Sequence, residues 1–202
     1  GTGGHCGRLS RGGGTRGRIG SFAGGGVMQA LFFLLNAIAG FFAFLFLLRF
    51  LMQWLRVSFS GQLGHFVVTT TNWAVKPLRR VIPGWRGFDW ASLLAAFVVQ
   101  LALTVLVVIL SGAGESLPDA LPFLLLAAVR GVLRLTIYIF IGALIMQAVL
   151  SWVNPFSPLA APVQQLTRPL LDPLRRVIPV ISGVDLSLLV AILLLQMLLI
   201  YV

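Results

Sequence analysis

Three polar side chains lie within otherwise apolar stretches of this sequence, where they could do chemistry inside a membrane. Arg49 stands near the end of one apolar stretch, and Gln100 and Gln196 stand near the middle of two others. A charge inside a membrane is costly unless it reaches the surface or finds a partner, whereas amides hydrogen-bond between helices. We expect Arg49 to reach the cytoplasmic surface, with a buried partner as the alternative. Gln100 and Gln196 are predicted to face each other across two helices.

A basic heptapeptide occurs twice. The sequence Pro-Leu-Arg-Arg-Val-Ile-Pro begins at position 77 and again at position 173, 96 residues further on. Arginines at an anionic leaflet contact lipid phosphates, which contributes about 1 kcal/mol for each basic residue. A site for a protein partner or an ion is the alternative. We favour the lipid anchor as the role of all four arginines, which are Arg79, Arg80, Arg175 and Arg176.

One aspartate follows each heptapeptide and directly precedes an apolar stretch. Asp89 and Asp185 keep the same spacing of 96 residues. A carboxylate just before a helix accepts hydrogen bonds from free backbone amides and meets the positive end of the helix dipole. We therefore expect both aspartates to cap helices, with ion pairs to the nearby arginines as the alternative.

The sequence gives little support to enzyme chemistry. Its two histidines, His5 and His65, stand apart, and no Cys and His cluster has the spacing of metal ligands. No Ser, His and Asp set suggests a catalytic triad. We therefore expect no enzymatic activity, no cofactor, no metal and no nucleic-acid partner. The single cysteine, Cys6, rules out an intramolecular disulfide.

The composition indicates a membrane protein. Apolar residues make up 58% of the 202 positions and charged residues only 10%, whereas soluble domains contain about 25% charged residues. The mean hydropathy is +1.00. Because a bilayer core of about 30 Å needs roughly 20 apolar residues, we predict four membrane-spanning helices, at Ala30–Leu55, Trp90–Leu110, Leu135–Val153 and Leu186–Val202.

Three other segments are predicted to lie at the membrane surface. The apolar residues between Pro122 and Leu133 are interrupted by Arg130, and Arg134 follows one helical turn later. We interpret this segment as an interfacial lead-in to the third span rather than as a further crossing. Apolar residues at helical spacing after the first and third spans predict two interfacial amphipathic segments. In the heptapeptides, the first proline suits a helix start and the second a helix stop.

Charge orients the predicted helices. The connections after the first and third spans are basic, whereas the connection after the second begins with Glu115 and Asp119. The positive-inside rule places both basic connections in the cytoplasm and both termini outside. Two copies that begin on the same side are parallel repeats.

The predicted organisation has four parts. Residues 1–27 are rich in Gly and Arg and are expected to be disordered or spurious, with the natural start at Met28 and a genuine basic arm as the alternative. Residues 28–112 form the first hairpin repeat, 113–134 an acidic loop with the interfacial lead-in, and 135–202 the second repeat. The fold class is an all-α membrane protein of four transmembrane helices arranged as two parallel hairpin repeats.

Several motifs together resemble the YggT family, also called YlmG. They are Leu-Leu-Arg-Phe-Leu-Met-Gln-Trp at 47–54, the two heptapeptides with the following Gly-x-Asp, and Ser-Trp at 151–152 before Pro-Leu-Leu-Asp-Pro at 169–173. The resemblance covers Met28 to Val202. It implies a small multi-pass protein of the bacterial inner membrane. For function it implies osmotic tolerance and potassium handling, a link to cell division, or help in cytochrome b6 haem attachment.

Two functions of different classes are open at this point. In the first, the chain contributes to osmotic adaptation or ion (potassium) homeostasis, and Arg49, Gln100 and Gln196 line a cleft between the repeats. In the second, it is a scaffold or assembly factor whose basic turns dock a partner. A wet cavity would favour the first, and a dry, packed bundle with an ordered loop surface the second. The expected partners are anionic lipid headgroups, a membrane or cytoplasmic protein, or a second copy in a homo-oligomer.

Overall fold

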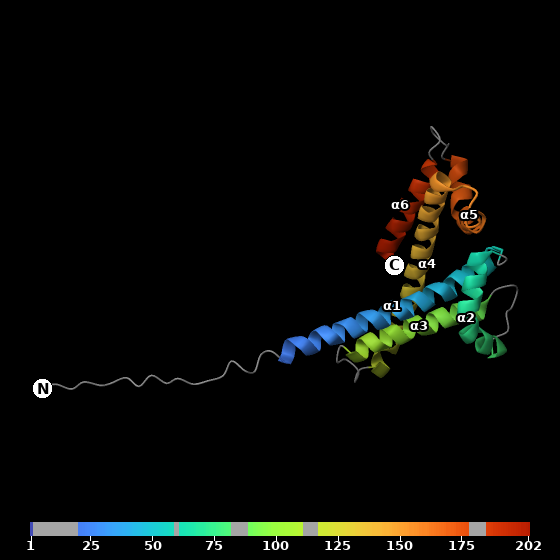
Figure 1. The fold of residues 1–202 in the computed structure, drawn as a ribbon. Helices are drawn as coiled ribbons and strands as arrows, with labels where there is room; N and C mark the ends of the chain where they lie inside the picture. Colours follow the sequence, from blue (N-terminus) through green and yellow to red (C-terminus); the bar gives the residue numbers. More distant parts are fainter. Residues whose placement is uncertain (2–19, 59–60, 82–88, 111–116, 178–184) are drawn as a thin grey trace. The chain divides into compact units, whose positions relative to one another are not determined.

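The computed structural model describes residues 1, 20–58, 61–81, 89–110, 117–177 and 185–202. These residues form helices and connecting turns, with no strand among them (Figure 1). The chain divides into two compact units, residues 1–37 and residues 38–202. The helices are α1 (Gly20–Trp54), α2 (Gln62–Val81), α3 (Trp90–Leu110), α4 (Leu117–Val153), α5 (Ala160–Val177) and α6 (Leu186–Tyr201).

The first unit contains the beginning of α1. The helix starts at Gly20, before Met28, so it includes the last part of the segment that was expected to be disordered. Residues 2–19 of that segment lie outside the described residues. Between Gln29 and Ala37 the apolar side chains are largely exposed, with Phe33 the most exposed at 73%. This exposure suits a helix that is surrounded by lipid.

Among the described residues, three helices are long and apolar enough to cross a membrane. Their candidate spans are Gln29–Trp54, Trp90–Leu110 and Ala120–Val153. The first two agree with the predicted spans to within one residue at each end. The structure therefore supports a membrane protein. The last predicted span corresponds to α6, which is apolar but has 16 residues and is about 24 Å long at 1.5 Å per residue.

Helix α4 joins the segment before the third span to that span. The predicted interfacial lead-in and the predicted span are one continuous helix of 37 residues, which contains Pro122. Arg130 and Arg134 do not interrupt it, because arginine is among the better helix formers and its charge affects the depth of a helix in a membrane rather than the helix itself.

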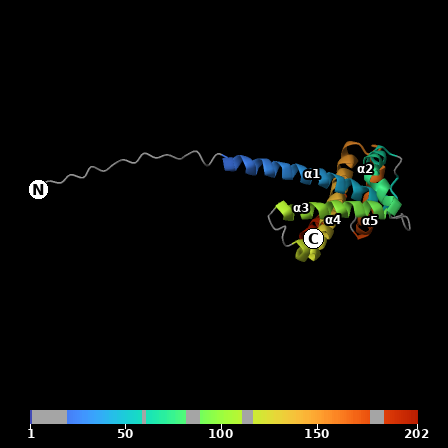
Figure 2. The same ribbon diagram turned by 90° about the horizontal axis from the view of Figure 1, so that it is seen from below.

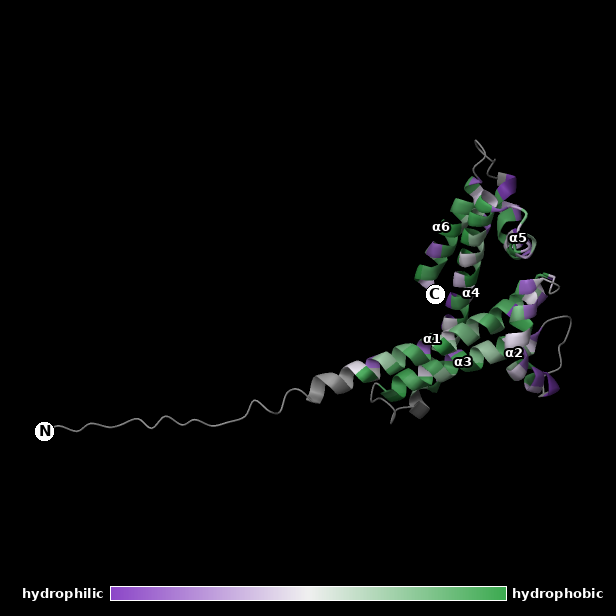
Figure 3. Ribbon diagram, in the orientation of Figure 1, coloured by the Kyte–Doolittle hydropathy of each residue, from purple (hydrophilic) through white to green (hydrophobic). Residues whose placement is uncertain are grey.

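Helices α2 and α5 are amphipathic, as predicted for the interfacial segments, and hydrophilic residues gather on them (Figure 3). They correct the expected place of the prolines, because Pro77 lies inside α2, and Pro169 and Pro173 lie inside α5. All three prolines are exposed. Solvent can therefore replace the helical hydrogen bond that each proline removes.

The second unit is held together by two clusters of buried apolar side chains. The larger includes Leu47 and Leu51 of α1, Ala96 of α3 and Ala143 of α4. The smaller joins α4, α5 and α6 through Leu144, Leu171 and Leu195. Helix α3 packs on α2 and α4, and α4 packs on α5 and α6. Figures 1 and 2 both show α3 running beside the part of α1 that belongs to this unit.

The end of α1 is closed by an arginine in the left-handed conformation. Arg56 has a φ of 54°, and its N–H donates to the carbonyl of Gln53 at 3.2 Å, while the N–H of Val57 donates to the carbonyl of Met52 at 2.8 Å. This is the Schellman arrangement, in which glycine is the usual residue at the left-handed position. Val57 and Met52 are buried in the larger cluster and supply the accompanying apolar contact.

Candidate functional site

A buried ion pair joins the end of α1 to the start of α3. Arg49 lies near the C-terminal end of α1, and Asp89 directly precedes α3. The Nε of Arg49 is 3.2 Å from Oδ2 of Asp89, and the two side chains are only 6% and 1% exposed. Their charges therefore meet inside the protein, and Arg49 follows the alternative of a buried partner rather than the favoured route to the surface.

The same arginine binds α2. Its Nη1 donates to Oγ1 of Thr71 at 2.8 Å and to Oδ1 of Asn72 at 3.1 Å. The Thr71 hydroxyl in turn donates to the carbonyl of Val67 at 2.6 Å, within α2. Arg49 thus connects three helices through charge-assisted hydrogen bonds, which are stronger than bonds between neutral groups.

Asp89 has a second arginine partner. Arg79, in the last turn of α2, donates from Nη2 to Oδ2 at 2.7 Å and from Nε to Oδ1 at 3.3 Å. The hydroxyl of Ser92 also donates to Oδ2, at 2.8 Å, while the backbone carbonyl of Asp89 accepts from the N–H groups of Ser92 and Leu93. Asp89 therefore follows the alternative of ion pairs with arginine, and its carboxylate accepts from the side chain of Ser92 rather than from a backbone N–H in the described contacts.

The cluster carries two guanidinium groups against one carboxylate. Burial alone would raise the pKa of Asp89. The hydrogen bonds from Arg79 and Ser92 and the positive charges of Arg79 and Arg49 act in the opposite direction and prevail, so the pKa lies below its ordinary value. Asp89 is thus a stable anion that holds two cations, and the cluster keeps a net positive charge.

A similar but more exposed pair of arginine and aspartate lies in the second half of the chain. Arg175 donates from Nε and Nη2 to Oδ2 of Asp185 at 3.0 and 2.6 Å. Asp185 caps α6 by accepting from the N–H of Ser187 at 3.2 Å. This pair is more exposed than the first, at 43% and 26%. Where the first half has Arg49 bonded to Thr71, the second half has Gln147 accepting a hydrogen bond from Thr167.

The remaining candidate residues lie apart from these clusters. Arg80 and Arg176 are exposed. Gln100 is half-buried on α3, with its side chain against Gly131 of α4, and Gln196 is exposed on α6. Sequence reasoning missed Thr71, although a signal was present, because Thr167 stands 96 residues further on, the spacing of the two heptapeptides.

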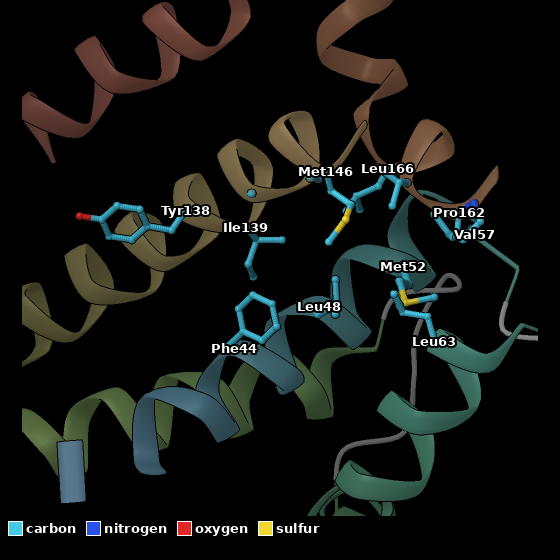
Figure 4. Close-up of a pocket in the computed structure, with 13 residues that line it drawn as sticks. Phe44, Leu48, Met52, Val57, Leu63, Tyr138, Ile139, Met146, Pro162 and Leu166 are labelled. Carbon is cyan, nitrogen blue, oxygen red and sulfur yellow. The ribbon is translucent and has the colours of Figure 1, made fainter. Parts of the chain in front are cut away.

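An apolar cleft of about 240 Å³ lies between α1, α4 and α5, with Leu63 of α2 at one side. Figure 4 shows Phe44 and Leu48 of α1 pointing toward Ile139 of α4, with Met146 and Leu166 further along. The residues of the charge cluster do not line it. Within the described ranges, no group of three His, Cys, Asp or Glu residues could hold a metal ion.

Comparison with known protein families shows to which family the chain is related. The sequence model of the CCB3/YggT family matches residues 28–110 and 126–202. This chain belongs to that family. The YggT-family match leaves out residues 1–27 and extends over both heptapeptides and both aspartates that carry the ion pairs.

YggT relatives are similar over most of the chain. The uncharacterised protein PA0392 of Pseudomonas aeruginosa is 37% identical over 164 residues, which cover 80% of this chain and 82% of that one. The uncharacterised protein YggT of Escherichia coli K12 is 32% identical over 169 residues, or 83% and 86% of the two chains. A protein encoded 3′ of proC in Vibrio alginolyticus is 34% identical over 166 residues, or 81% and 88%. No solved structure gives a significant match.

Proposed function

We propose that this YggT-family chain is a non-enzymatic, multi-pass protein of the bacterial inner membrane that serves as a scaffold or assembly factor. Its four crossings form two parallel hairpins, with α6 as the fourth, and α2 and α5 lie at the cytoplasmic surface. The observation that carries the proposal is the buried cluster around Asp89, which ties α2 to both helices of the first hairpin. A helix that only rested on lipid would not require such a buried attachment.

The attached helix offers a polar face to a partner. The exposed residues of α2 include a stripe at helical spacing, formed by Gln62, His65, Thr69, Lys76 and Arg80. Trp73 lies within the same stripe, about 40° from Thr69 around the helix axis, and Phe66 lies about 60° from Thr69; the two are 67% and 54% exposed. Aromatic side chains of this kind suit the membrane interface, so this face can lie at the boundary between the headgroups and the cytoplasm.

The packing of the helices favours a scaffold over an ion channel or transporter. Within the described part of the chain, every buried side-chain nitrogen and oxygen has a hydrogen-bond partner. The cleft between α1, α4 and α5 is lined almost wholly by carbon atoms. An interior without unpaired buried polar groups, together with a firmly attached surface helix, suits a docking protein.

Photo-crosslinking tests the scaffold role. A photoreactive residue at Thr69, on the polar stripe, should capture a specific protein in cells, and the same residue at Val107, an exposed position of α3, should capture lipid and no such protein. The charge reversals K76E and R80E should abolish the Thr69 product at unchanged abundance of the chain. Capture at Thr69 that survives both reversals would contradict the proposal.

One observation favours osmotic adaptation or potassium homeostasis as a second candidate. Arg49 is an ionised group within a candidate membrane span, and such residues often mark ion pathways. If the cluster handles ions, potassium flux into liposomes that contain the purified chain should depend on Asp89 and fall to background in D89N. Flux equal to that of empty liposomes would remove this candidate and leave the scaffold.

A further inference from the structure

Two exposed arginines lie within the longest candidate span. Arg130 and Arg134 are one turn apart on α4, inside the segment Ala120–Val153. Neither forms a hydrogen bond or an ion pair with another residue in the described ranges. Because a charge within a membrane is costly, an anionic ligand beside this turn of α4 would lower that cost for both side chains.

An apolar groove lies next to the same turn of α4. It has a volume of about 460 Å³ and is formed by α3, through residues that include Trp90, Leu94 and Phe97, and by α4, through Val129, Val132 and Leu133. Leu133 and Val129 are 49% and 44% exposed. Successive helical residues are 100° apart, so Arg130 projects about 60° from Leu133 around the α4 axis. The arginines therefore stand along one rim of the groove.

From this juxtaposition we infer a binding site for one anionic phospholipid, with an acyl chain in the groove and the phosphate between Arg130 and Arg134. Guanidinium groups bind phosphate oxygens through paired, charge-assisted hydrogen bonds, and basic pockets between membrane helices hold anionic headgroups. The groove adjoins the cluster around Asp89, because Trp90 directly follows that residue and the N–H of Leu93 donates to its carbonyl, but the two arginines of the site belong to α4.

The groove favours a lipid over an acidic membrane helix as the occupant. Almost all of its surface is carbon, which an acyl chain matches without further hydrogen bonds. A partner helix would bring only single side chains into a groove of this size. The positive charge also selects among lipids, because two basic residues favour an anionic over a zwitterionic headgroup by on the order of tenfold or more.

Trp90 lines the groove and can report its occupant. In the full chain with Trp54, Trp73, Trp85 and Trp152 replaced by Phe, Trp90 is the only tryptophan. Brominated phosphatidylglycerol, added as a minor component of phosphatidylcholine vesicles, should quench Trp90 far more than brominated phosphatidylcholine at the same fraction. The double variant R130Q/R134Q should remove this preference.

Matched variants separate the site from general surface charge. R80Q/R176Q removes the same amount of charge from exposed positions and should leave the preference intact, whereas V132F/L133F should fill the groove and lower quenching by both lipids. Equal quenching by the two brominated lipids, or a preference that survives R130Q/R134Q, would refute the site. So would a membrane protein that copurifies in equal amount with the chain and is released by R130Q/R134Q.

A second measurement covers the case in which the single-tryptophan chain does not fold. Native mass spectrometry of the otherwise unaltered chain in detergent with added phosphatidylglycerol should retain one lipid, and R130Q/R134Q should lose it while R80Q/R176Q keeps it. Retention that is equal in all three proteins would overturn the inference.

Discussion

Arg49 and Asp89 are 40 residues apart in the sequence, yet Nε of the first lies 3.2 Å from Oδ2 of the second. Both groups are almost fully buried, so their desolvation is offset only while they remain together. The pair holds the end of α1 against the start of α3. Because Arg49 also donates a hydrogen bond to Thr71, it holds α2 against α1 as well.

Replacing Arg49 should show how much of this arrangement depends on charge. R49L leaves Thr71 without its donor and removes one of the two cations at Asp89, which should cost about 3 to 5 kcal/mol. R49Q should cost less, because glutamine can bond to the threonine as Gln147 does to Thr167 in the second half. Unfolding of the purified proteins in denaturant measures both. Equal losses would show that the hydrogen bond to α2 contributes nothing.

The two arginines of one heptapeptide should differ in their tolerance of lysine. Arg79 holds Asp89 through two donors, which lysine cannot reproduce, so R79K should lose roughly 1 to 2 kcal/mol. Arg80 is exposed, and R80K should behave as the original chain. The pair R175K and R176K offers the same comparison in the second half. If R79K and R80K have the same melting temperature, the two-donor contact of Arg79 with Asp89 is not needed for stability.

The cluster should make stability depend on acid. Asp89 has a pKa below its ordinary value of 3.8, so the folded state binds the proton less readily than the unfolded state. Its stabilising contribution is complete above the unfolded-state pKa and is lost as the pH falls through the lower folded-state pKa. The melting temperature should therefore fall below about pH 4, and the fall should be smaller in D89N. If the melting temperature of D89N fell with pH as steeply as that of the original chain, Asp89 would not be the cause of the acid sensitivity.

A glycine at position 56 should stabilise the end of α1. Arg56 is in the left-handed conformation, which costs an L-residue roughly 1 kcal/mol or more and costs glycine nothing. R56G should raise the free energy of unfolding by a few tenths to about 1 kcal/mol, and R56A should not. Thermal unfolding of the two variants provides the test. A stabilising R56A would mean that the lost charge, and not the backbone, is responsible.

The proposed topology makes a prediction about sidedness. Reporter fusions after Arg86 and after Arg176 should both be cytoplasmic, and a fusion at Ser116 external, because the basic connections stay inside. The activities of a phosphatase reporter and a fluorescent reporter at the three sites measure this. Basic connections on opposite sides would contradict the parallel hairpins.

The sequence was informative about the helices and less so about their contacts. The bounds of α3 followed from an uninterrupted apolar stretch, since the length of such a stretch is a local property. The partner of Arg49 did not follow, because that contact depends on how α1, α2 and α3 pack. The ion pairs of Asp89 and Asp185 with arginine were an alternative, and both occur. The full length of α4 was not predicted, because Arg130 and Arg134 divide the apolar stretch from which the third span was predicted.

The length of α4 has a consequence for the lipid around the protein. Its 37 residues extend over about 55 Å, whereas the hydrocarbon core of a bilayer is about 30 Å thick. The helix must incline steeply, emerge into the headgroups or thicken the surrounding lipid, and each response costs free energy that changes with bilayer thickness. The acyl-chain length of the membrane should therefore affect how α4 lies in it.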